Sequence, residues 1–91
     1  MQVELRLFGP FREEAGVDAV DFDTDADSYG DLLREIEAAY PALEGQLHED
    51  DAIAGNTVVS RNKRDLRHLE GLDTPVADGD VVRLIPSVYG G

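Results

Sequence analysis

The residues of this sequence that could do chemistry stand at its end, where the chain reads Val88-Tyr89-Gly90-Gly91. The two glycines form a thin strip of backbone because neither carries a Cβ atom, so the strip can enter a narrow slot in a partner enzyme. We expect Val88, Tyr89 and Gly90 to serve partner recognition and the Gly91 carboxylate to be the reactive group. Because chain ends are often frayed, the alternative interpretation is a tail of ordinary linker residues.

A free carboxylate is a poor electrophile, since its negative charge repels nucleophiles and its leaving group would be oxide. The chain has no sequence typical of an enzyme that could activate this carboxylate. It lacks both the Gly-x-x-x-x-Gly-Lys pattern that cradles phosphates and the Gly-x-Ser-x-Gly nucleophile elbow. We therefore expect no catalysis by this chain itself.

Length and composition limit the classes of protein to consider. The 91 residues are enough for a single domain, here 1–91 with a flexible tail at about 87–91. The absence of cysteine excludes disulfides, thiolate metal sites and a cysteine nucleophile. No signal segment is recognisable, and no apolar run approaches about 18 residues, so we expect a cytoplasmic protein without a membrane partner.

The charge of the chain is strongly negative, with 20 acidic residues against 8 basic ones and a net charge of −12. Nucleic acids and anionic membranes are polyanions, so both are excluded as expected partners. The basic residues are seven arginines and a single lysine, Lys63. An acidic surface with little lysine indicates adaptation to high salt, where charges are screened over about 3 Å at 1 M. The alternative is an ordinary acidic protein.

The tail follows directly on a predicted strand at residues 81–85, which reads Val-Val-Arg-Leu-Ile. This run is apolar nearly throughout, which predicts a strand with both faces covered. Asp78-Gly79-Asp80 is a tight turn that starts the strand. Pro86 cannot donate a ladder hydrogen bond, so we expect pairing to fade there and the tail to leave the sheet.

Four further strands are predicted from alternation and composition, at residues 3–7, 19–23, 56–60 and, in a short form, 65–69. A helix is predicted over residues 29–40, with Asp27 or Ser28 as its cap and Pro41 as its end. Its expected apolar stripe is Leu32, Leu33, Ile36, Ala39 and Tyr40, and its expected outward side chains are Asp31, Arg34, Glu35 and Glu37. We expect Leu43 and Leu47 to fold back over the core.

One helix on a small mixed sheet is an α+β fold. The most economical arrangement places the first and last strands side by side at the centre, as in the ubiquitin-like β-grasp.

Metal binding is not predicted. The run His48-Glu49-Asp50-Asp51 is acidic but lacks the spacing of a calcium loop, so we interpret it as a solvated loop. His48 and His68 are not arranged in a ligand pattern and are expected at the surface or at an edge. Lys63 is the only lysine, so apart from the N-terminal amine it is the only candidate acceptor if copies of the chain are joined to one another. The alternative is an exposed turn lysine.

The sequence resembles the ubiquitin-like sulfur carriers of the MoaD/ThiS family, above all the archaeal members that also act as protein modifiers. The resemblance covers nearly the whole chain and rests on Leu7-Phe8, Phe11-Arg12-Glu13, Gly16, Asp31-Leu32-Leu33, Tyr40-Pro41-Ala42-Leu43, Leu72-Asp73-Thr74-Pro75-Val76, Asp78-Gly79-Asp80-Val81-Val82 and Ile85-Pro86-Ser87-Val88-Tyr89-Gly90-Gly91. Many members have a second proline where Ser87 stands. Together with the acidity, the scarce lysine and the terminal glycines, the chain is most similar to the modifiers of salt-loving archaea.

The resemblance implies that an E1-like enzyme uses ATP and Mg²⁺ to adenylate Gly91, with no cofactor bound to this chain. A lysine amine of a target protein would then give an isopeptide bond, whereas sulfur would give a thiocarboxylate that donates sulfide. A narrower alternative is a sulfur carrier only, the small subunit of molybdopterin synthase, which would partner the large subunit in molybdenum cofactor biosynthesis. A third alternative is a non-covalent β-grasp interaction module with an inert tail, against which the terminal glycines argue.

Overall fold

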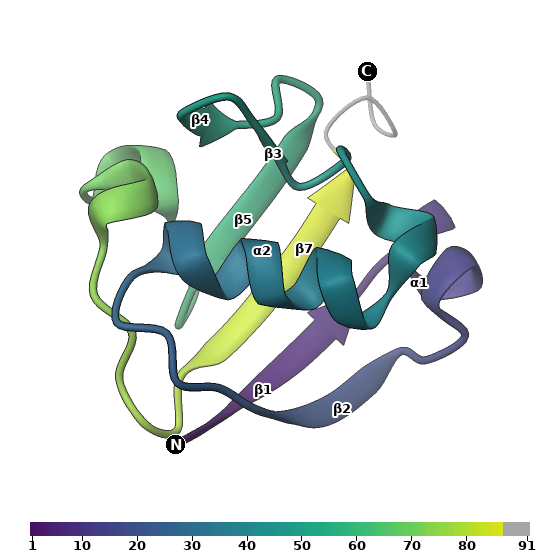
Figure 1. Cartoon of the computed structure of the whole chain (residues 1–91), viewed down its shortest axis with the longest axis horizontal. Helices are drawn as coiled ribbons and strands as arrows, with labels where there is room; N and C mark the ends of the chain where they lie inside the picture. The colour runs from purple at the N-terminus through teal and green to yellow at the C-terminus, as the bar shows by residue number, and fades with distance from the viewer. Residues whose placement is uncertain (87–91) are drawn as a thin grey trace.

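The computed structural model describes residues 1–86, so Val88, Tyr89, Gly90 and Gly91 lie outside the described residues. The main sheet has five strands in the order β2-β1-β7-β5-β6 (Figure 1). These strands are β1 (Gln2–Leu7), β2 (Ala19–Asp23), β5 (Thr57–Arg61), β6 (Arg64–Asp65) and β7 (Val81–Pro86). The other elements are helices α1 (Pro10–Ala15) and α2 (Tyr29–Ala39), the small hairpin of β3 (His48–Glu49) and β4 (Ala52–Ile53), and 3₁₀ turns at Pro41–Leu43, Leu66–His68 and Gly71–Asp73.

The first and last strands lie side by side at the centre of the sheet, as predicted. β1 and β7 run parallel, with Glu4 opposite Val81 and Leu7 opposite Leu84. The pairs β1–β2, β5–β7 and β5–β6 are antiparallel, so the sheet is mixed. Alternation along β1 buries its apolar residues on the side of the sheet that α2 covers.

Helix α2 crosses one face of the sheet and closes the core (Figure 1). Ser28 caps its start by accepting a hydrogen bond from the Asp31 amide at 3.3 Å. The negative charge of Asp31 in the first turn is stabilised by the positive end of the helix dipole. The shared core consists of fully buried side chains from α2, the sheet and the following segment, including Leu5, Leu7, Leu32, Leu33, Ile36, Leu43, Leu47, Val59, Val82 and Leu84. The predicted cover by Leu43 and Leu47 is therefore confirmed.

The predicted outer face of α2 is wrong at one residue. Glu37 is only 7% exposed, whereas Ala39, which was assigned to the apolar stripe, is exposed. The reason is that the chain after the helix folds back and presents the amides of Leu47 and His48 to the Glu37 carboxylate, at 3.0 and 3.2 Å. A carboxylate that accepts two backbone hydrogen bonds can be buried at modest cost.

Two strand predictions also need correction. In the predicted fourth strand, residues 65–69, only Asp65 belongs to β6, and Leu66–His68 form a 3₁₀ turn that directs Leu66 into the core. The prediction that both faces of β7 are covered is wrong. Along β7 buried residues alternate with half-buried ones, and the half-buried residues Val81, Arg83 and Ile85 lie on the face that no helix covers. Its pairing also continues to Pro86, which lies opposite Thr57.

The short segment after β1 forms helix α1. Pro10 occupies the first turn of α1, and Gly16 ends the helix at φ 79°, a left-handed conformation that suits glycine. One main helix on a mixed sheet confirms the α+β, β-grasp prediction. Over residues 1–86 no helix has both the length and the apolar character needed to cross a bilayer.

Candidate functional site

The candidate site is the end of β7, from which the chain leads to the terminal glycines. Pro86, the last described residue, is buried and lies opposite Thr57 of β5. On the other side, the Phe8 amide donates to the Leu84 carbonyl at 3.2 Å, so Phe8 lies beside the last residues of β7. Phe8 is 41% exposed, and among residues 1–86 it and Met1 are the large apolar side chains left in water. Strand β7 is thus held by β1 and Phe8 up to Leu84 and by β5 up to Pro86.

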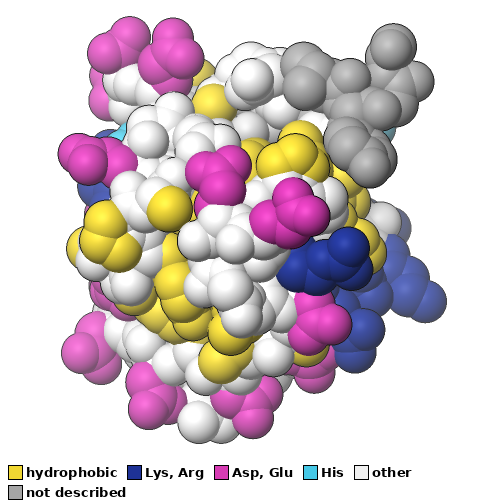
Figure 2. All heavy atoms as spheres, turned by 90° about the vertical axis from the view of Figure 1, so that its right-hand side faces the viewer, with side chains coloured by type: hydrophobic (Ala, Val, Ile, Leu, Met, Phe, Trp, Pro, Cys, Tyr) yellow, Lys and Arg dark blue, Asp and Glu magenta, His cyan; other side chains and the backbone are white. Residues whose placement is uncertain are grey.

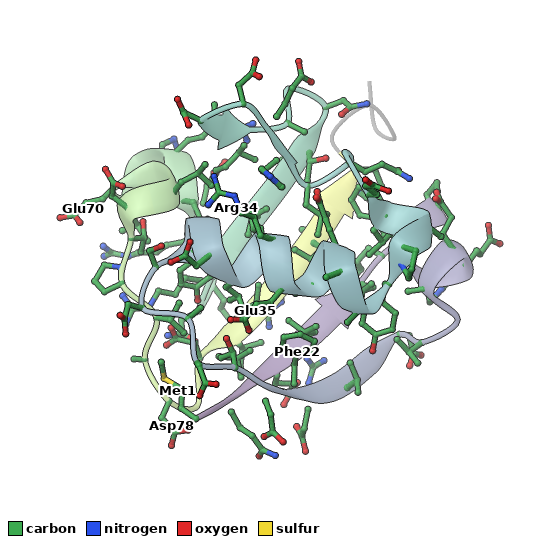
Figure 3. The ribbon with its side chains drawn as sticks, viewed as in Figure 1. Met1, Phe22, Arg34, Glu35, Glu70 and Asp78 are labelled. Carbon is green, nitrogen blue, oxygen red and sulfur yellow. The ribbon has the colours of Figure 1, made fainter. Side chains whose placement is uncertain are left out.

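The turn that starts β7 is fixed to the N-terminus of the chain. The Gly79 amide donates to the Gln2 carbonyl and the Gln2 amide donates to Asp78 Oδ1, both at 2.8 Å. Gly79 has φ 87°, which a side chain would strain, so the predicted turn is confirmed. Asp78 and Met1 lie at the same end of the molecule (Figure 3). The start of β7 is therefore locked to the start of β1.

Asp80 is the hub of a buried polar network at this turn. Its side chain is 3% exposed, and Oδ2 accepts hydrogen bonds from the Tyr29 hydroxyl at 3.0 Å, from Arg61 Nε at 2.9 Å and from the Ala77 amide at 3.0 Å. Oδ1 accepts from Asn62 Nδ2 at 3.0 Å. Four donors on one carboxylate join α2, the β5–β6 hairpin and the start of β7.

The electrostatics of this network follow from burial and hydrogen bonding. Burial alone disfavours the charge of Asp80, yet the hydrogen bonds from Ala77, Arg61, Asn62 and Tyr29 outweigh it and lower the pKa of Asp80. Burial, followed by the negative charge of Asp80, raises the pKa of Tyr29 far above that of a free phenol. At neutral pH the network therefore holds one carboxylate and one neutral phenol.

Lys63 lies in the turn between β5 and β6 and is exposed. Asn62 and Lys63 have φ 51° and 75°, and the Asn62 side chain fixes this left-handed turn by bonding Asp80 and accepting from the Val81 amide at 2.8 Å. The exposed ammonium thus stands on a turn that is tied to β7. The structure does not bring Lys63 to the candidate site. Its neighbour Asn62 is bonded to Val81 at the start of β7, whereas the candidate site is at the end of that strand, at Pro86.

The two histidines belong to different elements, His48 to β3 and His68 to the 3₁₀ turn Leu66–His68. His48 Nδ1 is 3.1 Å from Glu37 Oε1, an ion pair only when the imidazole is protonated, and His68 is exposed. The run at residues 48–51 is the hairpin of β3 and β4 rather than a plain loop, with Asp50 at φ 55° in its turn. Within residues 1–86 no group of three or more histidine or acidic side chains is placed to hold a metal ion.

The open face of the sheet, opposite α2, is the part of the site that sequence reasoning missed. Register places Val58 and Ile85 opposite each other on this face, next to the end of β7. Farther back, Arg83 stands between Arg6 on β1 and Ser60 on β5. Figure 2 shows Lys and Arg side chains gathered on the side of the molecule away from α2. Arg83, a charged residue in the middle of an otherwise apolar strand, is the sequence signal that could have indicated this half-covered face.

Comparison with known proteins assigns the chain to a family. The ThiS family matches residues 5–91. The chain is 41% identical to small archaeal modifier protein 3 of Haloferax volcanii, over the full length of both, which is consistent with the predicted haloarchaeal source.

The fold agrees with the crystal structure of SAMP1 from Haloferax volcanii, at 34% identity and a TM-score of 0.82 over the whole of both chains. It also agrees with the solution structure of small archaeal modifier protein 1 from Methanosarcina acetivorans, at 30% identity and a TM-score of 0.84 over 99% of this chain and 96% of that one. The resemblance seen in the sequence is thereby confirmed, and the chain belongs to the ThiS family.

Proposed function

We propose that this chain is a ubiquitin-like protein modifier and sulfur carrier whose Gly91 carboxylate is activated by an E1-like enzyme. The observation that carries the proposal is the full-length match to a small archaeal modifier protein, together with a family match that extends through residue 91. The fold supports it, because β7 is held by β1 up to Leu84 and by β5 up to Pro86, and it leads directly into the segment that holds the glycines. The chain supplies the transferred group, and the enzyme supplies ATP and Mg²⁺.

The proposed chemistry has two steps. A carboxylate oxygen of Gly91 attacks the α-phosphorus of ATP, which forms an acyl adenylate and releases pyrophosphate. The carbonyl carbon is then attacked by a lysine amine of a target, which loses a proton and displaces AMP to give an isopeptide bond. If hydrosulfide displaces AMP instead and loses its proton, the product is a thiocarboxylate that can donate sulfide.

Mass spectrometry of the protein isolated from its own cells tests the proposal and separates its branches. Sulfur in place of oxygen at Gly91 would demonstrate carrier chemistry. A remnant of the tail on lysines of other proteins, which is Gly-Gly after cleavage behind Tyr89 and residues 84–91 after tryptic cleavage behind Arg83, would demonstrate modification. A thiocarboxylate without remnants would favour a pure sulfur carrier. Finding neither product would contradict the proposal and favour a non-covalent module.

A truncated chain provides the matched control. Removal of Gly90 and Gly91 should leave the melting temperature unchanged, because the core elements lie within residues 1–86. The same removal should abolish both products. High-mass conjugates of the truncated chain would refute the role of the tail.

Joining of copies through Lys63 is a separate proposal that rests on its exposure and on its being the only lysine. Lys63→Arg keeps the charge and removes the acceptor amine. If Lys63 is the acceptor, the variant should lose any ladder of linked copies while its attachment to other proteins persists. An unchanged ladder would transfer the role to the Met1 amine, which donates to the Thr24 carbonyl at 3.1 Å.

A further inference from the structure

Strand β2 (Ala19–Asp23) is the outermost strand on one side of the main sheet (Figure 1). The Thr24 amide, one residue beyond β2, donates to the Met1 carbonyl at 2.9 Å, which fixes the phase of the pairing with β1. Backbone groups alternate in direction along an antiparallel strand, so the even-numbered residues of β2 face β1, as Thr24 does. The N–H and C=O groups of the odd-numbered residues, Asp21 among them, therefore point away from the sheet.

The opposite edge of the sheet is closed. Its outermost strand, β6, is only two residues long. Next to it, Arg67 Nη1 donates to the Thr57 carbonyl of β5 at 2.8 Å, so a side chain occupies that edge group. Folded proteins block their edges in such ways because an open edge pairs with other chains. Strand β2 is five residues long, and among residues 1–86 it pairs only with β1, so it is the open edge of this sheet.

The face of β2 that looks toward α2 is apolar and incompletely covered. Val20 and Phe22 pack against the core, yet both are half-buried rather than buried. Figure 3 shows Phe22 and Glu35 between the ribbons of α2 and β2. Thr24 Oγ1 donates to Glu35 Oε1 at 2.6 Å, which ties α2 to the chain just after β2. A strand added to β2 would place every second side chain beside Val20 and Phe22 and cover apolar surface that is left in water.

The other face of β2 selects the charge of the added strand. Asp21 and Asp23 are exposed on it, opposite Glu4 and Gln2 of β1. None of the ion pairs formed among residues 1–86 includes either aspartate. Like charges on neighbouring strands are destabilising and opposite charges are favourable. A second copy pairing through its own β2 would set aspartates against aspartates, whereas lysine or arginine on an incoming strand would pair with them.

We propose that β2 is a docking edge for an extended segment of a partner protein, which adds to the five-stranded sheet as a further strand. Its apolar side chains pack beside Val20 and Phe22, and its basic side chains pair with Asp21 and Asp23. In strand addition, main-chain hydrogen bonds supply affinity and side chains supply specificity. Because β1 separates β2 from β7, this recognition is non-covalent and does not use the Gly91 carboxylate. It therefore stands apart from the proposed function.

Amide hydrogen exchange of the full chain, measured by NMR, tests the docking edge. The probe is a peptide of alternating lysine and valine, slightly longer than the five residues of β2. In the free protein, exchange should be fast at Asp21 and slow at Val20 and Phe22, because only the latter two donate to β1. Saturating peptide should slow exchange at Asp21 by at least about 10-fold. If the peptide does not bind, or binds without slowing exchange there, the proposal is wrong.

N-methylated versions of the peptide separate strand addition from simple attraction between charges. The N–H groups of an added strand alternate in direction, so only one alternate set of the peptide residues donates to β2. Methylation of those nitrogens should abolish binding, whereas methylation of the other set should leave the Kd within about twofold. Equal binding of the two versions would show that the peptide does not pair with the backbone of β2 and would overturn the inference.

Asp21→Lys tests the charge of the edge while its backbone stays the same. The variant places opposite charges across β1 and β2 at Glu4, so its melting temperature should equal or exceed that of the wild type. The Kd of the lysine–valine peptide should rise by at least about 10-fold, and a glutamate–valine peptide should become the tighter ligand. Asp51→Lys is the matched control, because Asp51 is exposed and lies in the turn between β3 and β4. An equal effect of both variants would assign binding to net charge and contradict the proposal.

Self-association is the competing occupant of this edge. It is tested by measuring exchange at Asp21 in the free protein over a range of protein concentrations. Fast exchange at every concentration is expected, because the aspartates of two copies repel each other. Exchange that slows as the concentration rises would assign the edge to a second copy and overturn the choice of partner.

Discussion

Replacing Asp80 by asparagine should show how much of the stability of the fold depends on one buried carboxylate. The substitution keeps the shape of the side chain and removes its charge. The asparagine oxygen can take the place of Oδ2 and still accept from Tyr29, Arg61 and Ala77. Its NH₂ group then faces Asn62 Nδ2, donor against donor, so the fourth hydrogen bond is lost.

The expected loss follows from these contacts. A hydrogen bond to a charged group contributes about 1.5–3 kcal/mol, and this one is replaced by two opposed donors. The three remaining bonds lose the charge that strengthens them. We therefore expect Asp80→Asn to lower the free energy of unfolding by about 2–4 kcal/mol. Since small domains are stable by only about 5–15 kcal/mol, the change should be large enough to measure easily.

Urea unfolding in molar salt, followed by circular dichroism, is the assay. The difference between wild type and variant should also depend on pH. Because its hydrogen bonds lower the pKa of Asp80 in the folded state, the carboxylate contributes fully above the ordinary aspartate pKa. Its contribution is lost as the pH falls through the lowered value, so the two stabilities should converge at low pH.

Asp78→Asn is the matched control in the same turn. Asp78 is exposed, and an asparagine oxygen can still accept from the Gln2 amide, so the expected change is below about 0.5 kcal/mol. Equal stabilities of the two variants would refute the hub role of Asp80. A loss in Asp80→Asn that stays the same from neutral to acid pH would show that shape, rather than charge, is responsible.

Three further substitutions extend the test to other contacts. Burial, followed by the negative charge of Asp80, raises the pKa of Tyr29, so its phenol should ionise only when the wild-type protein unfolds at alkaline pH. Tyr29→Phe should therefore remove that step from the tyrosinate absorbance. The stability that the neutral phenol contributes is lost only above about pH 10. Gly30→Ala should cost about 1 kcal/mol in urea unfolding, since its Cβ would lie 3.3 Å from Leu72, whereas Gly55→Ala has open space and should be neutral. Glu37→Ala should cost about 2–4 kcal/mol, because two backbone amides lose their acceptor, and a loss below about 0.5 kcal/mol would contradict its burial.

The sequence predicted the frame of this fold because the frame depends on local periodicity. Alternation located β1, β2 and β5 to within a residue, and the polar cap and Pro41 located α2. The pairing of the first and last strands followed from the economy of the α+β arrangement. The family followed from motifs that span nearly the whole chain.

The parts that sequence reasoning missed depend on contacts between distant segments. Helical spacing alone places Glu37 on the outer face of α2. It is buried because the segment after Pro41 folds back and two of its backbone amides donate hydrogen bonds to the Glu37 carboxylate. The local sequence Asp78-Gly79-Asp80 predicts only a turn. It does not predict that the hydroxyl of Tyr29, 51 residues away in the chain, donates a hydrogen bond to Asp80. Ser60 and Arg83 likewise come to lie opposite each other only through strand register. The Gly91 site remains a prediction, because it lies outside the described residues.

The parallel pairing of β1 and β7 has a mechanical consequence. Met1 and Pro86 lie at opposite ends of two adjacent strands, so tension applied between the N-terminus and the tail pulls those strands past each other (Figure 1). Such a load falls on all the hydrogen bonds of the central pair at once instead of opening them one after another. If the chain is attached to a target as proposed, tension between its N-terminus and that attachment would therefore act on a mechanically stiff body.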